Sequence, residues 1–269
     1  MGRFFETVEV FNEPRQKYME RIKEPSWQPG MSETESGFLC GLIKQYRPRK
    51  ILEVGVAAGG TTAIIMQCVE NLRLECEIYS VDYVEQFHGS PNEKCGFIAQ
   101  RLKSEIEQDG IPIHNKTFLG NVLPAFLDQV GEGIDFVILD TAHVLPGEVL
   151  DFIAVLPFLS EGAIVCLHDI SLNQITEDEN IATNVLFNSV AGEKMLNLLP
   201  EKNRYGIDYP NIGAIRINGD TKRYMGNVLG ILTLCWKYMP SEKELKLYRD
   251  LYCKYYDVGV KSHMPLAAS

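Results

Sequence analysis

The chain is 269 residues long, carries a formal net charge of −10, and is 45% hydrophobic and 23% charged. This composition is typical of a soluble globular protein, and the acidic balance argues against a broad nucleic-acid-binding surface. No run of about 20 apolar residues occurs, so the sequence predicts no membrane span and no membrane partner.

The first part of the chain predicts helices before any strand. A helix is expected near residues 13–23, and a short second helix carries apolar positions from Phe38 to Ile43 and ends before Pro48. Residues 1–47 are therefore expected to form an N-terminal helical cap.

From residue 50 onward, short apolar runs alternate with helical patterns. Continuously apolar strands that alternate with helices predict a parallel sheet covered on both faces. The predicted strands are 50–54, 76–82, 112–118, 134–140 and 162–169, and the predicted helices between them are 61–72, 94–108, 122–130 and 146–159.

After residue 169 this alternation ends. Residues 171–184 form a polar, acidic loop whose length is typical of a lid, and 203–218 predicts a strand–turn–strand that adds an antiparallel edge. Helices are expected at 225–239 and 242–256. The predicted fold is thus a single α/β domain with a Rossmann-like doubly wound sheet, mostly parallel with one antiparallel edge strand. Its core spans 48–218, and 219–269 is a C-terminal helical extension.

The stretch "ILEVGVAAGG" (51–60) is a glycine-rich loop after the first predicted strand. In such a sheet this loop places a ligand at the carboxyl ends of the strands. When the dinucleotide fingerprint is registered on Gly55 and Gly60, its middle glycine falls on Ala57, and no Lys-Ser or Lys-Thr pair follows as in a Walker motif. The loop therefore predicts a nucleoside ligand without a phosphate bridge.

Glu53-x-Gly55-x-x-x-Gly59 resembles motif I of class I S-adenosylmethionine-dependent methyltransferases. The resemblance implies that Asp82, which closes the second strand, accepts hydrogen bonds from the ribose hydroxyls. It also implies that "LGNVLP" (119–124) passes the adenine. The cofactor-binding residues implied by this resemblance are Glu53, Gly55, Ala57, Gly59, Thr61, Asp82, Gly120, Asn121 and Asp140.

Two acid-and-histidine segments end neighbouring predicted strands: "LDTAH" the fourth and "LHD" the fifth. Because adjacent strands lie about 4.8 Å apart, Asp140, His143 and Asp169 are expected to converge beside the cofactor. Methyl transfer to a hydroxyl needs alignment and removal of the hydroxyl proton, by a general base or with a divalent cation. His168 is expected to point away from Asp169 by strand alternation, which favours a structural role.

The pattern around these residues resembles metal-dependent O-methyltransferases of the catechol and macrocin (antibiotic-sugar) types, and the cephalosporin-hydroxylase-like group. The resemblance implies that Asp140 and Asp169 are the acidic positions, with His143 at the position of the base. The second acid or amide of the fifth-strand pair is replaced by Ile170, which cannot ligate a metal. Mg²⁺ held by Asp140 and Asp169 with several waters remains one alternative, and metal-free base catalysis is the other.

The sequence thus predicts an enzyme that moves a methyl group from S-adenosylmethionine to a hydroxyl of a small polar acceptor, such as a sugar or a polysaccharide or natural-product precursor. Asp140 and Asp169 orient the acceptor, and His143 takes its proton. Two other hypotheses stay open: a nicotinamide-dependent oxidoreductase, against which Ala57 argues, and a non-catalytic member of the methyltransferase fold, which Ile170 favours.

The cysteines and the N-terminus indicate the cellular setting. Seven cysteines occur with no Cys-x-x-Cys pair, which is typical of reduced thiols, and "MGRFFETVEVFNEPRQ" lacks the apolar core of a signal peptide. We therefore expect a cytoplasmic protein without a nucleic-acid partner. A homo-oligomer is left open.

Overall fold

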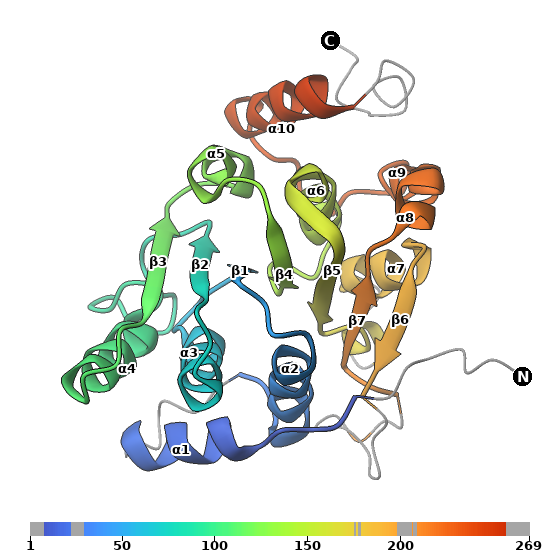
Figure 1. The fold of residues 1–269 in the computed structure, drawn as a ribbon. Helices are drawn as coiled ribbons and strands as arrows, with labels where there is room; N and C mark the ends of the chain where they lie inside the picture. The colour runs from blue at the N-terminus through green and yellow to red at the C-terminus, as the bar shows by residue number, and fades with distance from the viewer. Residues whose placement is uncertain are drawn as a thin grey trace, which may run out of the picture.

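One mixed sheet forms the centre of the molecule (Figure 1). The computed structural model describes residues 8–22, 30–174, 176, 179–197, 206 and 209–256. The strand order is β3-β2-β1-β4-β5-β7-β6; β1 to β5 are parallel, and β7 runs antiparallel to both β5 and β6. The strands are β1 (Lys50–Val54), β2 (Glu77–Asp82), β3 (His114–Leu119), β4 (Ile134–Leu139), β5 (Leu159–His168), β6 (Glu193–Leu196) and β7 (Ile212–Arg216).

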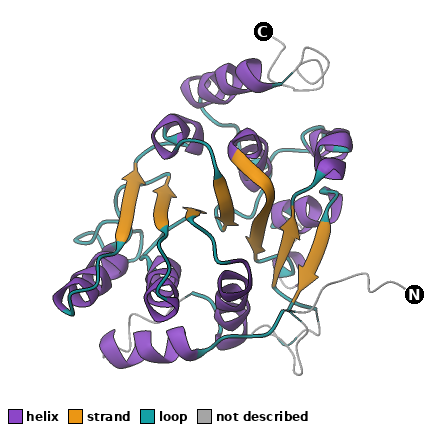
Figure 2. Ribbon diagram, in the orientation of Figure 1, coloured by secondary structure: helices purple, strands orange, loops and turns teal. Residues whose placement is uncertain are grey.

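Helices cover both faces of this sheet (Figure 2). Helices α1 to α4 pack on one face, and α5, α6, α7, α9 and α10 pack on the other (Figure 1). The α-helices are α1 (Glu13–Ile22), α2 (Glu33–Tyr46), α3 (Gly60–Leu72), α4 (Phe97–Gln108), α5 (Leu127–Val130), α6 (Gly147–Val155), α7 (Ala182–Ser189), α8 (Gly219–Arg223), α9 (Met225–Ile231) and α10 (Glu242–Tyr255). Short 3₁₀ turns are η2 (Leu123–Ala125), η3 (Leu156–Phe158) and η4 (Leu172–Gln174).

Strand alternation divides the interior into two apolar cores. On β4, Phe136 and Ile138 pack with the N-terminal helices, whereas Val137 and Leu139 pack with α6 and the C-terminal helices. All four side chains are fully buried. Because a strand buried on both faces needs apolar residues at nearly every position, the continuous apolar runs correctly predicted the central strands β1, β4 and β5.

The predicted class, a mostly parallel doubly wound sheet with an antiparallel edge, is confirmed. The edge hairpin is built differently from the prediction, because β7 pairs with 193–196, whereas the predicted first strand after 203 lies largely outside the described residues. The helix predicted at 225–239 ends at Ile231. There the hydroxyl of Thr233 donates to the carbonyl of Gly230 at 2.7 Å, which competes with the helical pattern.

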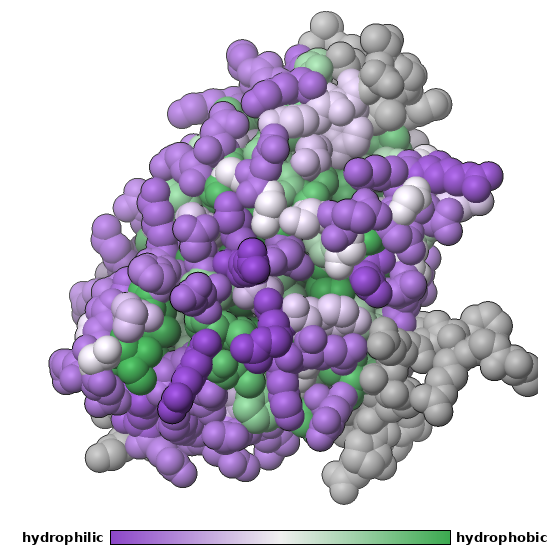
Figure 3. All heavy atoms as spheres, in the orientation of Figure 1, coloured by the Kyte–Doolittle hydropathy of each residue, from purple (hydrophilic) through white to green (hydrophobic). Residues whose placement is uncertain are grey.

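The surface agrees with the acidic, polar composition. In the view of Figure 3, hydrophilic side chains cover most of the described surface, and apolar side chains show only in patches between them. Among the described residues, no helix combines the length and the apolar character needed to cross a membrane.

Candidate active site

The glycine-rich loop between β1 and α3 joins three strands at their carboxyl ends. Gly55 has φ +95°, its N–H donates to the carbonyl of Val81 at 2.9 Å, and the Asp140 N–H donates to Val54 at 2.9 Å. A Cβ at Gly55 would overlap the carbonyl oxygen of Asp140. Only glycine combines this φ with such close backbone contact, so the loop and the end of β4 are held together at this residue.

Asp82 organises the same loop from the end of β2. Its Oδ2 accepts hydrogen bonds from the N–H groups of Val56 (2.8 Å) and Ala57 (2.9 Å), and Oδ1 accepts from Val84 (3.0 Å). Ala57 adopts a left-handed conformation with φ +48°. The carboxylate at the predicted ribose position therefore also fixes the backbone of the loop.

Two other residues of the predicted cofactor set lie beneath the loop. Glu53 is fully buried, the hydroxyl of Thr62 donates to its Oε2, and burial raises its pKa to about 8. Gly59 begins α3 against the following loop, where a Cβ would come within 2.8 Å of the Gly96 Cα. Both residues shape the loop from below and do not line the cavity above it.

Most of the remaining predicted cofactor residues line a cavity of about 720 Å³, a size typical of small-molecule sites. Gly55, Ala57, Asp82, Asn121 and Asp140 line it. Thr61 lies in the first turn of α3, and Gly120 follows β3 with its N–H bonded to the Asp82 carbonyl at 3.0 Å; neither lines the cavity.

The far wall of this cavity comes from the C-terminal part of the chain. Tyr238, Met239, Glu244 and Tyr248 line it together with Asp151 of α6. The hydroxyl of Tyr248 donates to Asp151 Oδ1 at 2.8 Å, and burial raises the pKa of Asp151 to about 7. In the sequence, the tyrosines of α10 recur on one helical face, a spacing typical of packing, and nothing in this pattern indicates that Tyr248 lines the cavity.

Asp140, His143 and Asp169 come together as the two strand-end segments predict. His143 Nε2 lies 3.8 Å from Asp140 Oδ1 and 3.4 Å from Asp169 Oδ2. His143 has φ +59° and Asp169 has φ +57°. Asp140 belongs both to this cluster and to the cavity wall, so the cluster adjoins the cavity.

Glu148 is fully buried and contacts His143 at its backbone N–H and at the Nδ1 side of its ring. Its Oε1 accepts the His143 backbone N–H at 2.7 Å and lies 3.4 Å from His143 Nδ1. The Ala182 N–H donates to the His143 carbonyl at 3.0 Å, so both sides of this left-handed residue are bonded. Sequence reasoning identified Glu148 only as an acidic residue in a helix first turn.

The charges of this cluster make the imidazole of His143 a stronger base. Burial opposes protonation of His143, but Glu148 and the carboxylates of Asp140 and Asp169 prevail and raise its pKa above 6.5. Asp169 responds in the opposite sense: burial opposes its charge, and bonds from His168 and Asn211 hold its pKa far below its usual range.

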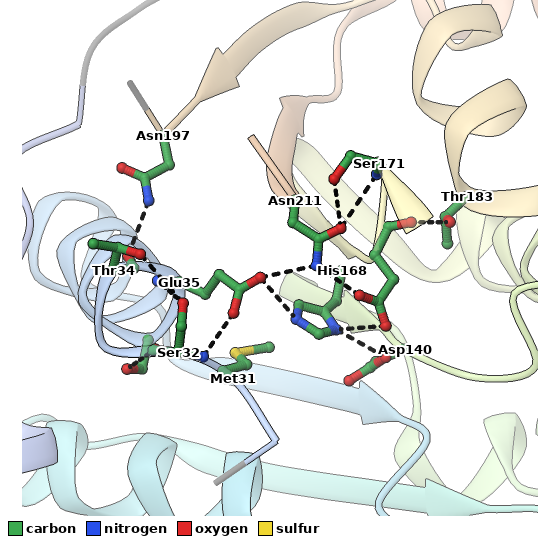
Figure 4. Close-up of polar contacts among 12 residues, drawn as sticks. Met31, Ser32, Thr34, Glu35, Asp140, His168, Ser171, Thr183, Asn197 and Asn211 are labelled. Atoms are coloured by element: carbon green, nitrogen blue, oxygen red, sulfur yellow. Dashed lines mark hydrogen bonds and ion pairs between the residues drawn. The ribbon is translucent and has the colours of Figure 1, made fainter. Parts of the chain in front are cut away.

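His168 is a correction to the sequence interpretation. Instead of pointing away from Asp169, its Nδ1 lies 3.4 Å from Asp169 Oδ2 and 3.2 Å from Asp140 Oδ1 (Figure 4). Strand alternation fails here because β5 ends at His168 and Asp169 turns into the left-handed region. Glu35 of α2 faces the other ring nitrogen, Nε2, at 3.5 Å.

The cluster offers a fitting donor set for a divalent cation. Asp140, His143 and Asp169 each present one ligand atom, and these atoms lie within 4.8 Å of one another. Ile170 is fully buried in the apolar core and contributes nothing to this set. Two carboxylates with room for water match the coordination that Mg²⁺ accepts.

The fold and the site define a class of protein. A Rossmann-like sheet with an antiparallel edge, a glycine loop after β1 and an acidic residue at the end of β2 characterise class I methyltransferases. Residues 52–170, from β1 to the end of β5, match the family model described as "Methyltransferase domain". This part of the chain is therefore a methyltransferase domain, and its fold is that of the class I enzymes, which use S-adenosylmethionine.

Solved structures share this fold at low sequence identity. The O-methyltransferase TomG from Streptomyces achromogenes, involved in tomaymycin synthesis and solved with S-adenosylmethionine, is 17% identical with a TM-score of 0.52, covering 79% of this chain and 92% of that one. A candidate O-methyltransferase from Klebsiella pneumoniae is 12% identical (TM-score 0.52, covering 78% and 91%). A candidate caffeoyl-CoA O-methyltransferase from Staphylococcus aureus is 13% identical (TM-score 0.50, covering 76% and 91%). No curated protein matches the chain.

Proposed function

We propose that this protein transfers a methyl group from S-adenosylmethionine to a hydroxyl of a small polar acceptor, such as a sugar or a polysaccharide or natural-product precursor. The observation that carries the proposal is the position of Asp140, which borders the cofactor cavity and contacts His143. A base and two carboxylates therefore adjoin the place where a methyl donor would bind. TomG, which shares the fold, was solved with this donor.

The chain's own residues divide the work between cofactor and acceptor. S-adenosylmethionine supplies an electrophilic methyl group when bound. The Gly55 loop, Asp82 and Asn121 hold the nucleoside, and Asp140 and Asp169 orient the acceptor hydroxyl. His143 Nε2 receives the hydroxyl proton, while Glu148 fixes the ring from the Nδ1 side.

The proposal also includes a divalent cation. Asp140 and Asp169 would hold Mg²⁺, with waters completing its shell, and the bound ion would acidify the acceptor hydroxyl. A sugar hydroxyl has a much higher pKa than a catechol, so such assistance matters more for a sugar. His143 would then remain the proton acceptor beside the ion.

Calorimetric titration with S-adenosylhomocysteine, with and without Mg²⁺ and with NAD⁺ as a control, tests the proposal. Micromolar binding of S-adenosylhomocysteine alone is expected, followed by turnover in a screen that begins with nucleotide sugars. If only NAD⁺ bound, the oxidoreductase hypothesis would replace this one. Cofactor binding without turnover on any hydroxylated acceptor would favour a non-catalytic member of the fold.

The proposal also covers the cellular location and the partners of the protein. The reduced cysteines predict a cytoplasmic enzyme whose partner is a small molecule and not a nucleic acid. A homo-oligomer stays open until the mass of the protein in solution is measured.

A further inference from the structure

We propose that Glu35, His168 and Asn211 form a buried relay that fixes the orientations of Asp140 and Asp169, which makes helix α2 part of the active site. Figure 4 shows the three side chains between α2 and the ends of the central strands. This inference rests on the proposed function, because it assigns positioning residues to the two carboxylates that orient the acceptor.

Glu35 begins the relay at the start of α2. It forms a capping box with Ser32: its Oε2 accepts the Ser32 N–H at 2.6 Å, and its own N–H donates to the Ser32 hydroxyl at 3.3 Å. Glu35 is only 2% exposed, and its second oxygen, Oε1, faces Asn211 and His168. The capping box of α10 (Ser241 and Glu244) lies in an exposed setting, so capping alone does not require a buried glutamate.

Asn211 carries one arm of the relay to Asp169. Its Nδ2 donates both to Glu35 Oε1 at 2.9 Å and to Asp169 Oδ1 at 2.6 Å. Its Oδ1 accepts from the hydroxyl of Ser171 at 2.7 Å and from the Ser171 N–H at 3.3 Å. Because the amide nitrogen faces two carboxylates and the oxygen faces two donors, only one orientation of this amide satisfies its surroundings.

His168 carries the other arm to Asp140. Its Nδ1 lies 3.2 Å from Asp140 Oδ1, and its Nε2 lies 3.5 Å from Glu35 Oε1. The side chain is 4% exposed, so water cannot take the place of either carboxylate. The two arms meet at Glu35, and together they form a closed ring through Asp169.

Burying the charged side chains of this ring costs folding free energy, and a role in the active site would explain that cost. Burying several carboxylates is unfavourable unless each is paired and hydrogen-bonded, and apolar residues often stabilise a fold as well or better. Outer partners that orient functional groups typically change activity by about 10–100-fold when they are replaced. We therefore expect Glu35→Gln to lower kcat within about this range while the affinity for S-adenosylhomocysteine stays unchanged, because Glu35 does not line the cofactor cavity.

NMR of ¹⁵N-histidine-labelled protein provides a readout that needs no acceptor. His143 lies across Asp140 and Asp169 from Glu35, so a shift of its ring resonances in Glu35→Gln reports transmission through the two carboxylates. Variants His143→Asn and His168→Asn assign the signals among the five histidines. The relay predicts that Glu35→Gln shifts the resonances of both His168 and His143.

Asn197→Ala is the matched control, because Asn197 Nδ2 donates to the Thr34 carbonyl at 3.0 Å and ties α2 to the end of β6 without touching the relay. It should leave the His143 resonances in place. Ser171→Ala, which removes the hydroxyl that bonds the Asn211 amide, is a milder second variant and should move both histidines in the same direction as Glu35→Gln.

A shift confined to His168 in the Glu35 and Ser171 variants, or an equal shift of His143 in Asn197→Ala, would overturn the relay. Failure of the wild-type protein to bind S-adenosylhomocysteine would refute the proposed function, while the NMR comparison would still decide the relay. The two proposals can therefore fail separately.

Discussion

The proposed cofactor side and the proposed acceptor side of the site are built in different ways. On the proposed cofactor side, Asp82 bonds the N–H groups of Val56 and Ala57, 26 and 25 positions away, and the contacts run largely through the backbone of one loop. On the acceptor side, side chains meet from distant segments: Asn211 bonds Glu35 across 176 positions. A local backbone site leaves a motif in the sequence, whereas a site of converging side chains does not.

Removing the base should have the largest effect. His143→Ala removes the proton acceptor from the acceptor side and should lower the transfer rate by about 10²–10⁴-fold, measured with the acceptor found in the screen. Affinity for S-adenosylhomocysteine should stay nearly intact, because His143 does not line the cofactor cavity. His114→Ala, at an exposed position on β3, is the control. An unchanged rate in His143→Ala would remove this residue from the mechanism.

The corresponding test on the proposed cofactor side is a substitution in the glycine-rich loop after β1. Gly55→Ala adds a methyl group that overlaps the Asp140 carbonyl, at a residue with positive φ. Strain of about 1–3 kcal/mol is typical of such overpacking, which corresponds to roughly a 5–150-fold loss of affinity if the cofactor-bound loop bears it. Calorimetry with S-adenosylhomocysteine measures this loss.

Gly110→Ala separates the overlap at Gly55 from the backbone strain. Gly110 also has positive φ (+80°), but a Cβ there would meet nothing within 4 Å. It should lower the melting temperature without changing the affinity for S-adenosylhomocysteine. If Gly55→Ala retained full affinity, the tight loop would not be what defines the cofactor side.

The sequence predicted what depends on local pattern. The apolar runs predicted β1, β4 and β5 because these central strands are buried on both faces, whereas β3 is a largely exposed edge strand. The loop after β1 was recognisable because Gly55 occupies a position that excludes a side chain. Asp140, His143 and Asp169 were predicted to converge because they follow adjacent parallel strands.

The rest depended on tertiary contacts. Glu35 carried one local sign, the Ser32-x-x-Glu35 capping box, but this pattern says nothing about burial or about Asn211. His168 was misjudged because alternation holds only while the strand continues, and the strand ends at that residue. The pairing of β6 with β7 is set by long-range contacts that no short pattern encodes.

The cavity wall formed by α6 and α10 is an exception to this comparison. Its side chains come from segments that are far apart in the sequence. Asp151, buried and bonded by Tyr248, has a pKa raised from 3.8 to about 7. Between these two values the folded protein holds a proton that the unfolded chain releases. The stability from this proton is complete below about pH 3.8 and is lost as the pH rises through 7.

Asp151→Asn cannot titrate, and the Tyr248 hydroxyl can still donate to its amide oxygen. Relative to the wild type, its melting temperature should rise between pH 5 and pH 8 by roughly 5–10 °C, because about two pH units at roughly 1.4 kcal/mol each separate pH 5 from a pKa of about 7. Tyr248→Phe removes the hydrogen bond but keeps the titrating carboxyl, so it should be less stable throughout and retain the pH slope. Parallel melting curves for Asp151→Asn and the wild type between pH 5 and 8 would show that Asp151 is already ionised in the folded protein. The Asp151–Tyr248 pair would then contribute no pH-dependent stability to the wall between α6 and α10.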